Sequence, residues 1–169
     1  MEEIINKVAN SSLAVFDLED FFPNHAFVTF DLSIALWEGF VLREKDFRDF
    51  VQNHDWEPFQ NKIVLLDCST DAIVPAWAYI LISVALHQKA FDVFKGNQAH
   101  YLEAYYSRKL CQIDYETYRD KPVILKGCSK KPVPEAAYVM AMSELQNVAK
   151  SVMYGEACSA VPLFKNRIK

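Results

Sequence analysis

The fold is decided by residues 62–94, which begin with Lys62-Ile63-Val64-Leu65-Leu66-Asp67, continue with an apolar segment from Pro75 to His87, and end with Ala90-Phe91-Asp92-Val93-Phe94. The first run is short, apolar and rich in branched residues, which is typical of a strand buried on both faces. The segment 75–87 is apolar on all sides and is long enough for a central helix. A strand, a helix and a second strand in this order predict a crossover between parallel strands.

The same alternation continues toward the C-terminus. Asn97 is in position to cap the next helix. Strands are expected at 123–125 and 152–154, on either side of an amphipathic helix at 134–149. We therefore predict an α/β fold with a mostly parallel sheet covered by helices, of the three-layer Rossmann-like or flavodoxin-like type.

Residues 1–61 are less regular. Strands are expected at 13–18 and 26–32, with a hairpin around Pro23-Asn24, and a helix is expected at 43–54. These strands would add antiparallel neighbours to the edge of the sheet. A chain of 169 residues is expected to form one domain. That domain, 1–169, would consist of an N-terminal part (1–61) and repeated strand–turn–helix units (62–169).

Composition and charge exclude several classes of protein. The chain has 18 Lys and Arg against 22 Asp and Glu, a net charge of −4, and therefore lacks the basic surplus of a general nucleic-acid binder. No basic-then-apolar leader opens the sequence, and the charge-free run 72–88 is too short to span a bilayer. We expect a cytoplasmic protein that does not associate with membranes, in which the four cysteines stay reduced.

A Cys-Ser pair followed by Val-Pro occurs three times. The pairs are Cys68-Ser69, Cys128-Ser129 and Cys158-Ser159. Each comes just after an expected strand, in a turn at its carboxyl end, where open parallel sheets bind ligands. If the strands take the common order 2-1-3-4, the strands that precede these pairs are neighbours, and the thiols of Cys68, Cys128 and Cys158 converge.

Three converging thiolates would select zinc or an iron–sulfur cluster. Four side chains are candidates for a fourth ligand: Asp67, Asp71, Glu156 and His54. Such a site would make the protein a metal-binding or iron–sulfur-binding accessory protein. The alternative is that the cysteines only pack, because buried cysteine is common and no Cys-x-x-Cys pair is present.

Two further readings stay open. An anion site is expected where Ser69, Ser129, Lys130 and Lys131 flank helix N-termini, and one thiolate would then serve a cysteine-dependent enzyme of small anionic substrates. The alternative to an anion site is that these lysines form a solvated basic turn that binds no ligand. The third reading is a homodimeric interaction module without catalysis, formed through the Phe-rich stretch 16–30. Whether the protein is an enzyme is therefore open.

Several of these motifs resemble one family, the uncharacterised bacterial proteins called domain-of-unknown-function family 2480. The stretches that carry the resemblance are Leu42-Arg43-Glu44-Lys45-Asp46-Phe47-Arg48, His54-Asp55-Trp56, Cys68 to Tyr79, Gly127 to Pro134, and Met153-Tyr154-Gly155-Glu156 with Cys158-Ser159. Members are often encoded beside genes for iron–sulfur cluster assembly. The resemblance implies, by association, iron–sulfur assembly proteins as partners and a role near cluster assembly or delivery.

Overall fold

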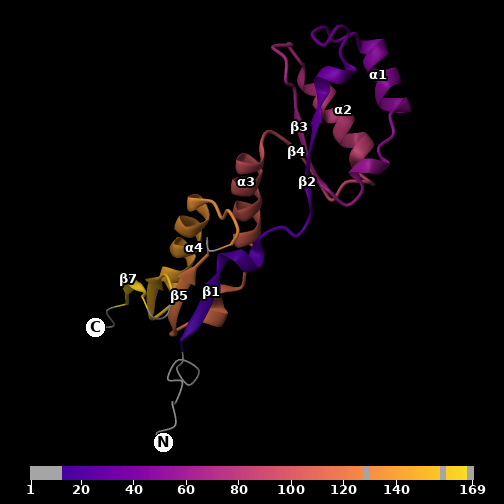
Figure 1. The fold of residues 1–169 in the computed structure, drawn as a ribbon. Coiled ribbons are helices and arrows are strands. Elements are labelled where there is room, and N and C mark those ends of the chain that lie inside the picture. The colour runs from indigo at the N-terminus through magenta and orange to yellow at the C-terminus, as the bar shows by residue number, and fades with distance from the viewer. Residues whose placement is uncertain (1–12, 128–129, 157–158, 167–169) are drawn as a thin grey trace, which may run out of the picture. The chain divides into compact units, whose positions relative to one another are not determined.

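The computed structural model describes residues 13–127, 130–156 and 159–166, and the chain divides into two compact units. Unit 1 contains the chain up to Phe22 and from Leu102 onward, whereas unit 2 runs from Pro23 to Tyr101. Unit 2 is therefore inserted into the sequence of unit 1 (Figure 1). The single-domain expectation stays a prediction, but no boundary falls at residue 61.

Unit 2 is a three-stranded parallel sheet with helices between its strands. Its elements are β2 (Phe27–Asp31), η2 (Leu32–Ala35), α1 (Glu44–Asn53), η3 (Glu57–Phe59), β3 (Ile63–Asp67), α2 (Ala76–Leu86) and β4 (Asp92–Lys95). The strand order is β2-β3-β4, and both pairs are parallel. Consecutive neighbours in a parallel sheet require the crossovers that α1 and α2 supply.

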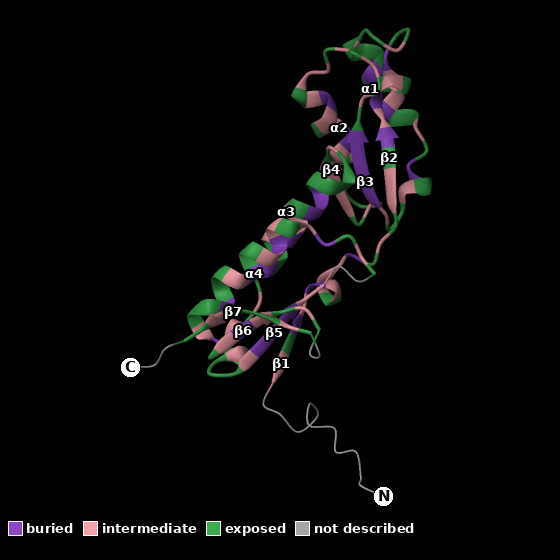
Figure 2. Cartoon of the chain, turned by 60° about the vertical axis from the view of Figure 1, so that its left-hand side comes forward, coloured by how far each residue is buried: buried purple, intermediate pink, exposed green. Residues whose placement is uncertain are grey.

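The core of unit 2 lies between this sheet and its two helices. Val64 and Leu66 of β3 pack with Phe47 of α1 and with Ile82 and Leu86 of α2, and all five are buried. On the alternate residues of β3, Ile63 and Leu65 are also buried, so β3 is the central strand (Figure 2). This burial on both faces explains the unbroken apolar run that predicted the strand.

Unit 1 has a four-stranded sheet in the order β1-β5-β6-β7. Its elements are β1 (Ala14–Asp17), η1 (Leu18–Phe21), most of α3 (Gln98–Leu110), η4 (Tyr115–Tyr118), β5 (Pro122–Lys126), α4 (Glu135–Val148), β6 (Ser151–Tyr154) and β7 (Val161–Lys165). The first three strands are parallel, and β7 runs antiparallel to β6. In the core, the ring of Phe16 stacks on that of Tyr115 at 5.7 Å, and the Tyr106 hydroxyl donates to the Leu18 carbonyl at 2.8 Å.

The two units repeat one plan of strand, 3-10 turn, helix, 3-10 turn, strand, helix, strand. Equivalent hydrogen bonds recur: the N–H of Gly96 donates to Leu66 in unit 2, and that of Gly155 donates to Leu125 in unit 1, both at 3.1 Å. The helices α2 and α4 also correspond. Ala78, Ile82 and Leu86 are buried in α2, and Ala137, Ala141 and Leu145 are buried in α4. The chain is thus an internal duplication in which one copy is inserted into the other.

The α/β class with mostly parallel strands is confirmed, and the strands and helices predicted from residues 13–18 onward are present. The order 2-1-3-4 in one sheet is wrong, because β3 pairs with β2 and β4, whereas β5 pairs with β1 and β6. The hairpin and the antiparallel N-terminal strands are also not found, since β1 and β2 join different sheets in parallel. Each N-terminal strand completes one copy of the repeated plan. Among the described residues, no helix has the length and apolarity needed to cross a membrane.

Candidate functional site at the carboxyl edge of unit 2

The carboxyl edge of unit 2 is organised by Asp31, the last residue of β2. The Asp31 carboxylate accepts the Ser69 N–H at 3.0 Å, the Ser69 hydroxyl at 2.6 Å and the Ser33 N–H at 3.0 Å. These hydrogen bonds, that of the Ser69 side chain above all, hold the pKa of Asp31 far below its ordinary value of 3.8. An ionised carboxylate therefore joins the turn after β2 to the loop after β3 at neutral pH.

A second contact joins the same two segments. The Thr70 hydroxyl donates to the Gly39 carbonyl at 2.7 Å, and the Cys68 Sγ lies 3.5 Å from the Thr70 Oγ1. Gly39 and the preceding Glu38 both have positive φ angles, 78° and 51°. A glycine accepts that backbone conformation without strain, which lets the chain turn there. A hydrogen bond thus connects the loop between η2 and α1 to the loop between β3 and α2.

An open cavity of about 590 Å³ lies between these loops. Its lining is mainly apolar and comes from both segments: Phe40, Val41, Leu42, Glu44, Asp71, Ala72, Ile73, Pro75 and Trp77. Phe40 is 59% exposed and Ile73 is 93% exposed, so these walls face solvent. Asp71 and Glu44 contribute the carboxylates at its margin. The cavity can take an apolar group, and Asp71 places a carboxylate beside it, whereas the Glu44 carboxylate is paired with Arg48.

The margin of the cavity also carries stacked and paired cations. The Arg43 guanidinium lies 3.9 Å from the centre of the Trp37 ring, and Trp37 itself is 43% exposed. Arg48 donates to Glu44 at 2.9 Å and lies over the Trp77 ring at 5.4 Å. Aromatic rings with arginines over them are frequent at protein interfaces.

The described part of the equivalent edge of unit 1 carries a group of ion pairs. Lys126 at the end of β5 lies 3.1 Å from the Asp17 carboxylate and 3.8 Å from that of Glu156. The hydrogen bond to Asp17 and then the charges of both carboxylates raise the pKa of Lys126.

The predicted anion-binding turn contains a carboxylate of the chain itself. The Lys130 N–H donates to the Glu19 carboxylate at 2.8 Å, and the Lys131 ammonium donates to the Glu19 carbonyl at 3.2 Å. In unit 2, Ser69 likewise gives its N–H and its hydroxyl to Asp31. Ser129 lies outside the described residues. The backbone N–H groups of Lys130 and Ser69 and the Ser69 hydroxyl are therefore directed at carboxylates of the chain itself, and the Lys131 ammonium at a backbone carbonyl. The anion site stays a prediction.

The three cysteines of the predicted metal site belong to the sequences of two different units, and their convergence stays a prediction. Cys68 follows β3 in unit 2, where it packs against the apolar core, while Cys128 and Cys158 lie outside the described residues, in the sequence of unit 1. The convergence of all three thiols rested on neighbouring strands that are in fact in two sheets. Within 13–127, 130–156 and 159–166, no group of three His, Cys, Asp or Glu side chains is placed to hold a metal ion. Cys111 is exposed.

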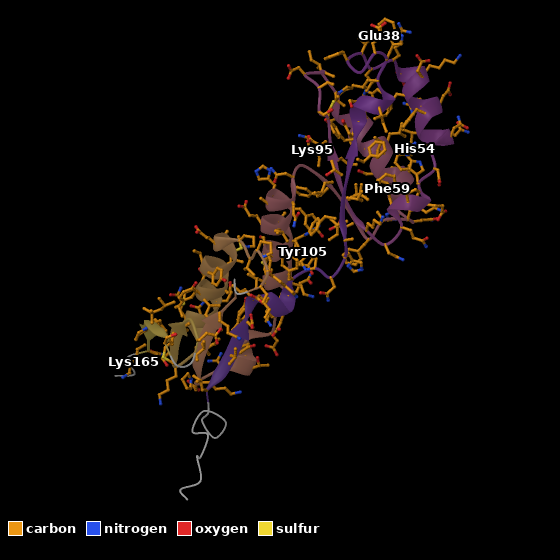
Figure 3. All side chains as sticks on the ribbon, viewed as in Figure 1. Glu38, His54, Phe59, Lys95, Tyr105 and Lys165 are labelled. Carbon is orange, nitrogen blue, oxygen red and sulfur yellow. The ribbon has the colours of Figure 1, made fainter. Side chains whose placement is uncertain are left out.

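The candidate fourth ligands are dispersed. His54 follows α1 and packs among aromatic rings, at 4.8 Å from Phe50 and 4.5 Å from Trp56, close to Phe59 (Figure 3). Asp67 ends β3 and Asp71 lines the cavity, both in unit 2, whereas Glu156 pairs with Lys126 in unit 1.

Sequence reasoning missed the residues that form the cavity. Phe40, Ile73 and Trp77 are apolar, and periodicity alone does not separate an exposed apolar side chain from a buried one. The Phe-rich stretch that was expected to pack or to form a dimer face does pack in part, since Phe16 and Phe30 are buried. One signal in the sequence does point to exposed apolar side chains. No charged residue occurs between Asp71 and Lys89, although α2, which lies in this segment, packs through only one face.

The fold and this edge define a mostly parallel α/β protein with an open, mainly apolar cavity in the segments that follow β2 and β3. The chain belongs to the family described as protein of unknown function (DUF2480), whose model matches residues 2–166 of the 169-residue chain. No curated protein and no solved structure matches it.

Proposed function

We propose that the protein is a binding module without catalysis, whose unit 2 binds a protein segment that carries apolar side chains and a positive charge. The observation that carries this proposal is the open cavity at the carboxyl edge, with Phe40, Ile73 and Trp77 in its lining and Asp71 at its margin. Ligands of open parallel sheets bind outside the carboxyl ends of the strands, which is where this cavity lies.

The shape of the cavity favours a protein segment over a small molecule. Small-molecule sites enclose most of the ligand surface, whereas Phe40 and Ile73 stand more than half exposed on this face. Trp37 and Val41 add further exposed apolar surface on the same loop, at 43% and 48%. Contiguous exposed apolar side chains with a polar margin are typical of contacts between proteins.

The chemistry of the edge favours binding over catalysis. The pKa of the Asp31 carboxyl is lowered, and its oxygens already accept hydrogen bonds from Ser69 and Ser33. Cys68 packs against the core with a hydroxyl group, that of Thr70, near its sulfur. A general base or an activated nucleophile needs a different arrangement, in which the base contacts the nucleophile.

Peptide titrations followed by tryptophan fluorescence test this proposal. All three tryptophans, Trp37, Trp56 and Trp77, belong to unit 2. We expect a peptide of alternating leucine and lysine to change the emission saturably, and a leucine–glutamate peptide of the same length to bind far more weakly.

Two variants and a control make the test specific. Phe40→Ser and Asp71→Asn should each weaken binding of the lysine peptide about fivefold to tenfold, or about 1–1.4 kcal/mol. Leu163→Ser removes an equally exposed apolar side chain from unit 1 and should leave binding unchanged. Equal binding of the two peptides, or full binding by Phe40→Ser, would refute the proposal.

One observation favours a second candidate, a metal site in unit 1. The strands β5 and β6 are parallel neighbours, and the Gly155 N–H donates to the Leu125 carbonyl at 3.1 Å. The loops that carry Cys128 and Cys158 therefore begin side by side, with Glu156 as a further candidate ligand. Two thiolates and a carboxylate suit zinc, and an iron–sulfur accessory role would follow from the family resemblance.

Metal analysis tests the second candidate. Purified protein should contain zinc or iron in stoichiometric amount, and both Cys128→Ser and Cys158→Ser should lose it. Cys68→Ser is the matched control and should keep it, because Cys68 belongs to the other sheet. Metal-free protein that takes up neither ion on reconstitution would exclude this candidate.

A further inference from the structure

Two segments of unit 2 form facing walls of the cavity at the carboxyl edge. Phe40 and Val41 belong to the turn 36–41, called here the wall turn, and Ile73 belongs to the loop 68–75 between β3 and α2, called here the wall loop. The two segments are far apart in the sequence. The spacing of the walls therefore depends on contacts that join one segment to the other.

The wall turn is held together by its own backbone. The Trp37 N–H donates to the Val41 carbonyl at 2.9 Å, and the Val41 N–H donates to the Trp37 carbonyl at 3.1 Å. Between them, the Gly39 N–H donates to the Leu36 carbonyl at 3.1 Å. A turn with these internal hydrogen bonds moves as one body, so a contact at its tip also sets the positions of the apolar side chains that it carries.

The start of the wall loop is anchored to the sheet. Ser69 donates its N–H and its hydroxyl to Asp31, the last residue of β2, at 3.0 and 2.6 Å. Hydrogen bonds to a charged acceptor are stronger than those between neutral groups. The backbone of the next residue, Thr70, therefore has a defined position from which its side chain reaches the wall turn.

Thr70 joins the two walls. Its hydroxyl donates to the Gly39 carbonyl, at the tip of the wall turn, at 2.7 Å. Each of these two residues is followed directly by a residue that lines the cavity, Asp71 after Thr70 and Phe40 after Gly39. The hydrogen bond thus lies at the point where both walls begin.

Packing between the helices holds the other end of the walls. The ring of Phe47, near the start of α1, packs edge to face on that of Trp77, near the start of α2, with 5.7 Å between the ring centres. Phe47 is buried, so the two helices cannot separate without losing buried apolar contacts. The hydroxyl of Thr70, in contrast, can be removed without opening the core.

We propose that Thr70 is a positioning residue of the binding site, which holds the wall turn at the spacing from the wall loop that lets both walls contact one peptide. This inference rests on the proposed function, because it concerns the same cavity. Without the hydrogen bond, peptide binding must also order the wall turn, and ordering a segment on binding lowers affinity. The net strength of one hydrogen bond corresponds to a change of about threefold to tenfold.

Variants at Thr70 test this inference. Thr70→Val replaces the hydroxyl by a methyl group and should weaken binding of the leucine–lysine peptide about threefold to tenfold. Thr70→Ser keeps the hydroxyl and should bind almost as tightly as the unaltered chain. Ser83→Ala is the matched control in unit 2, because the Ser83 hydroxyl donates to the Tyr79 carbonyl at 2.9 Å within α2 and joins no two segments. It should leave the affinity unchanged.

Backbone amide relaxation, measured by NMR without peptide, separates positioning from a general loss of stability. The amides of the wall turn should gain motion in Thr70→Val but not in Thr70→Ser or Ser83→Ala. Full peptide affinity of Thr70→Val, or unchanged relaxation of its wall turn, would overturn this inference and leave the proposed function standing. Absence of peptide binding by the unaltered chain would overturn both.

Discussion

Replacement of Asp31 by asparagine should destabilise unit 2 more than any other exposed Asp→Asn change in it. The carboxylate accepts three hydrogen bonds, two from Ser69 and one from Ser33, at 2.6–3.0 Å. Hydrogen bonds to a charged acceptor are worth about 1.5–3 kcal/mol net. Asparagine keeps one carbonyl acceptor and loses the charge, and the Ser69 donors are exposed to water. We therefore expect a loss of about 2 kcal/mol, on the basis of the same hydrogen-bond energies.

The matched control is Asp55→Asn, also in unit 2. Its carboxylate is exposed and accepts a hydrogen bond from the Glu57 N–H at 3.0 Å. We expect a loss of only a few tenths of a kcal/mol there, as for an exposed cap whose donor water can satisfy. Urea unfolding followed by tryptophan fluorescence reports unit 2 alone, because Trp37, Trp56 and Trp77 all lie in it.

The stability lost in Asp31→Asn should also depend on pH, in a direction that the pKa of Asp31 fixes. The pKa of Asp31 is lowered in the folded protein, so its stabilisation is present above the unfolded pKa near 3.8 and is lost as pH falls from there toward the folded pKa. The difference between the unaltered chain and Asp31→Asn should thus be constant near neutral pH and shrink below pH 3.8. A difference no larger than that of Asp55→Asn, or one that grows on acidification, would refute the reasoning.

Four further substitutions concern unit 1 and the loop glycines. Gly127→Ala places a Cβ 2.8 Å from a tyrosine oxygen at a φ of 154°, whereas at Gly39 (φ 78°) nothing lies within 4 Å. We expect Gly39→Ala to cost about 1 kcal/mol for its backbone and Gly127→Ala clearly more, measured by thermal unfolding. Asp17→Asn should lower the pKa of Lys126, seen by NMR titration of the lysine side chain; an unchanged pKa would contradict the contact. Tyr106→Phe should cost about 1–2 kcal/mol by urea unfolding followed by circular dichroism, since it leaves a buried carbonyl without its donor.

The secondary structure was predictable because its signals are local. The run from Ile63 to Leu66 is apolar throughout, and β3 is indeed buried on both faces. The Asn97 cap was also correct, since its side chain accepts the His100 N–H at 3.0 Å. The strand β7 was missed, because its burial is slight and its short apolar run, Val161 to Phe164, is interrupted by Pro162, which argues against a strand.

The sheet order was not predictable from these signals. Short buried strands such as β3 and β5 have nearly the same pattern and could pair with any parallel neighbour. The pairing follows from the division into units: β2 pairs with β3 inside unit 2, whereas β1 pairs with β5, which follows the whole of unit 2 in the sequence. The repeated Cys-Ser motif was the visible trace of this duplication. The sequence pattern predicts one metal site shared by the three copies, whereas Cys68-Ser69 belongs to unit 2 and the other two copies belong to the sequence of unit 1.

The most direct test of the binding face is an amide NMR map of the full chain titrated with the leucine–lysine peptide. We predict that the shifts concentrate in residues 40–44 and 71–77, which line the cavity, and leave the strands of unit 1 unmoved. Shifts confined to unit 1, or no saturable shift in residues 40–44 and 71–77, would contradict the assignment of the carboxyl edge of unit 2 as the binding site.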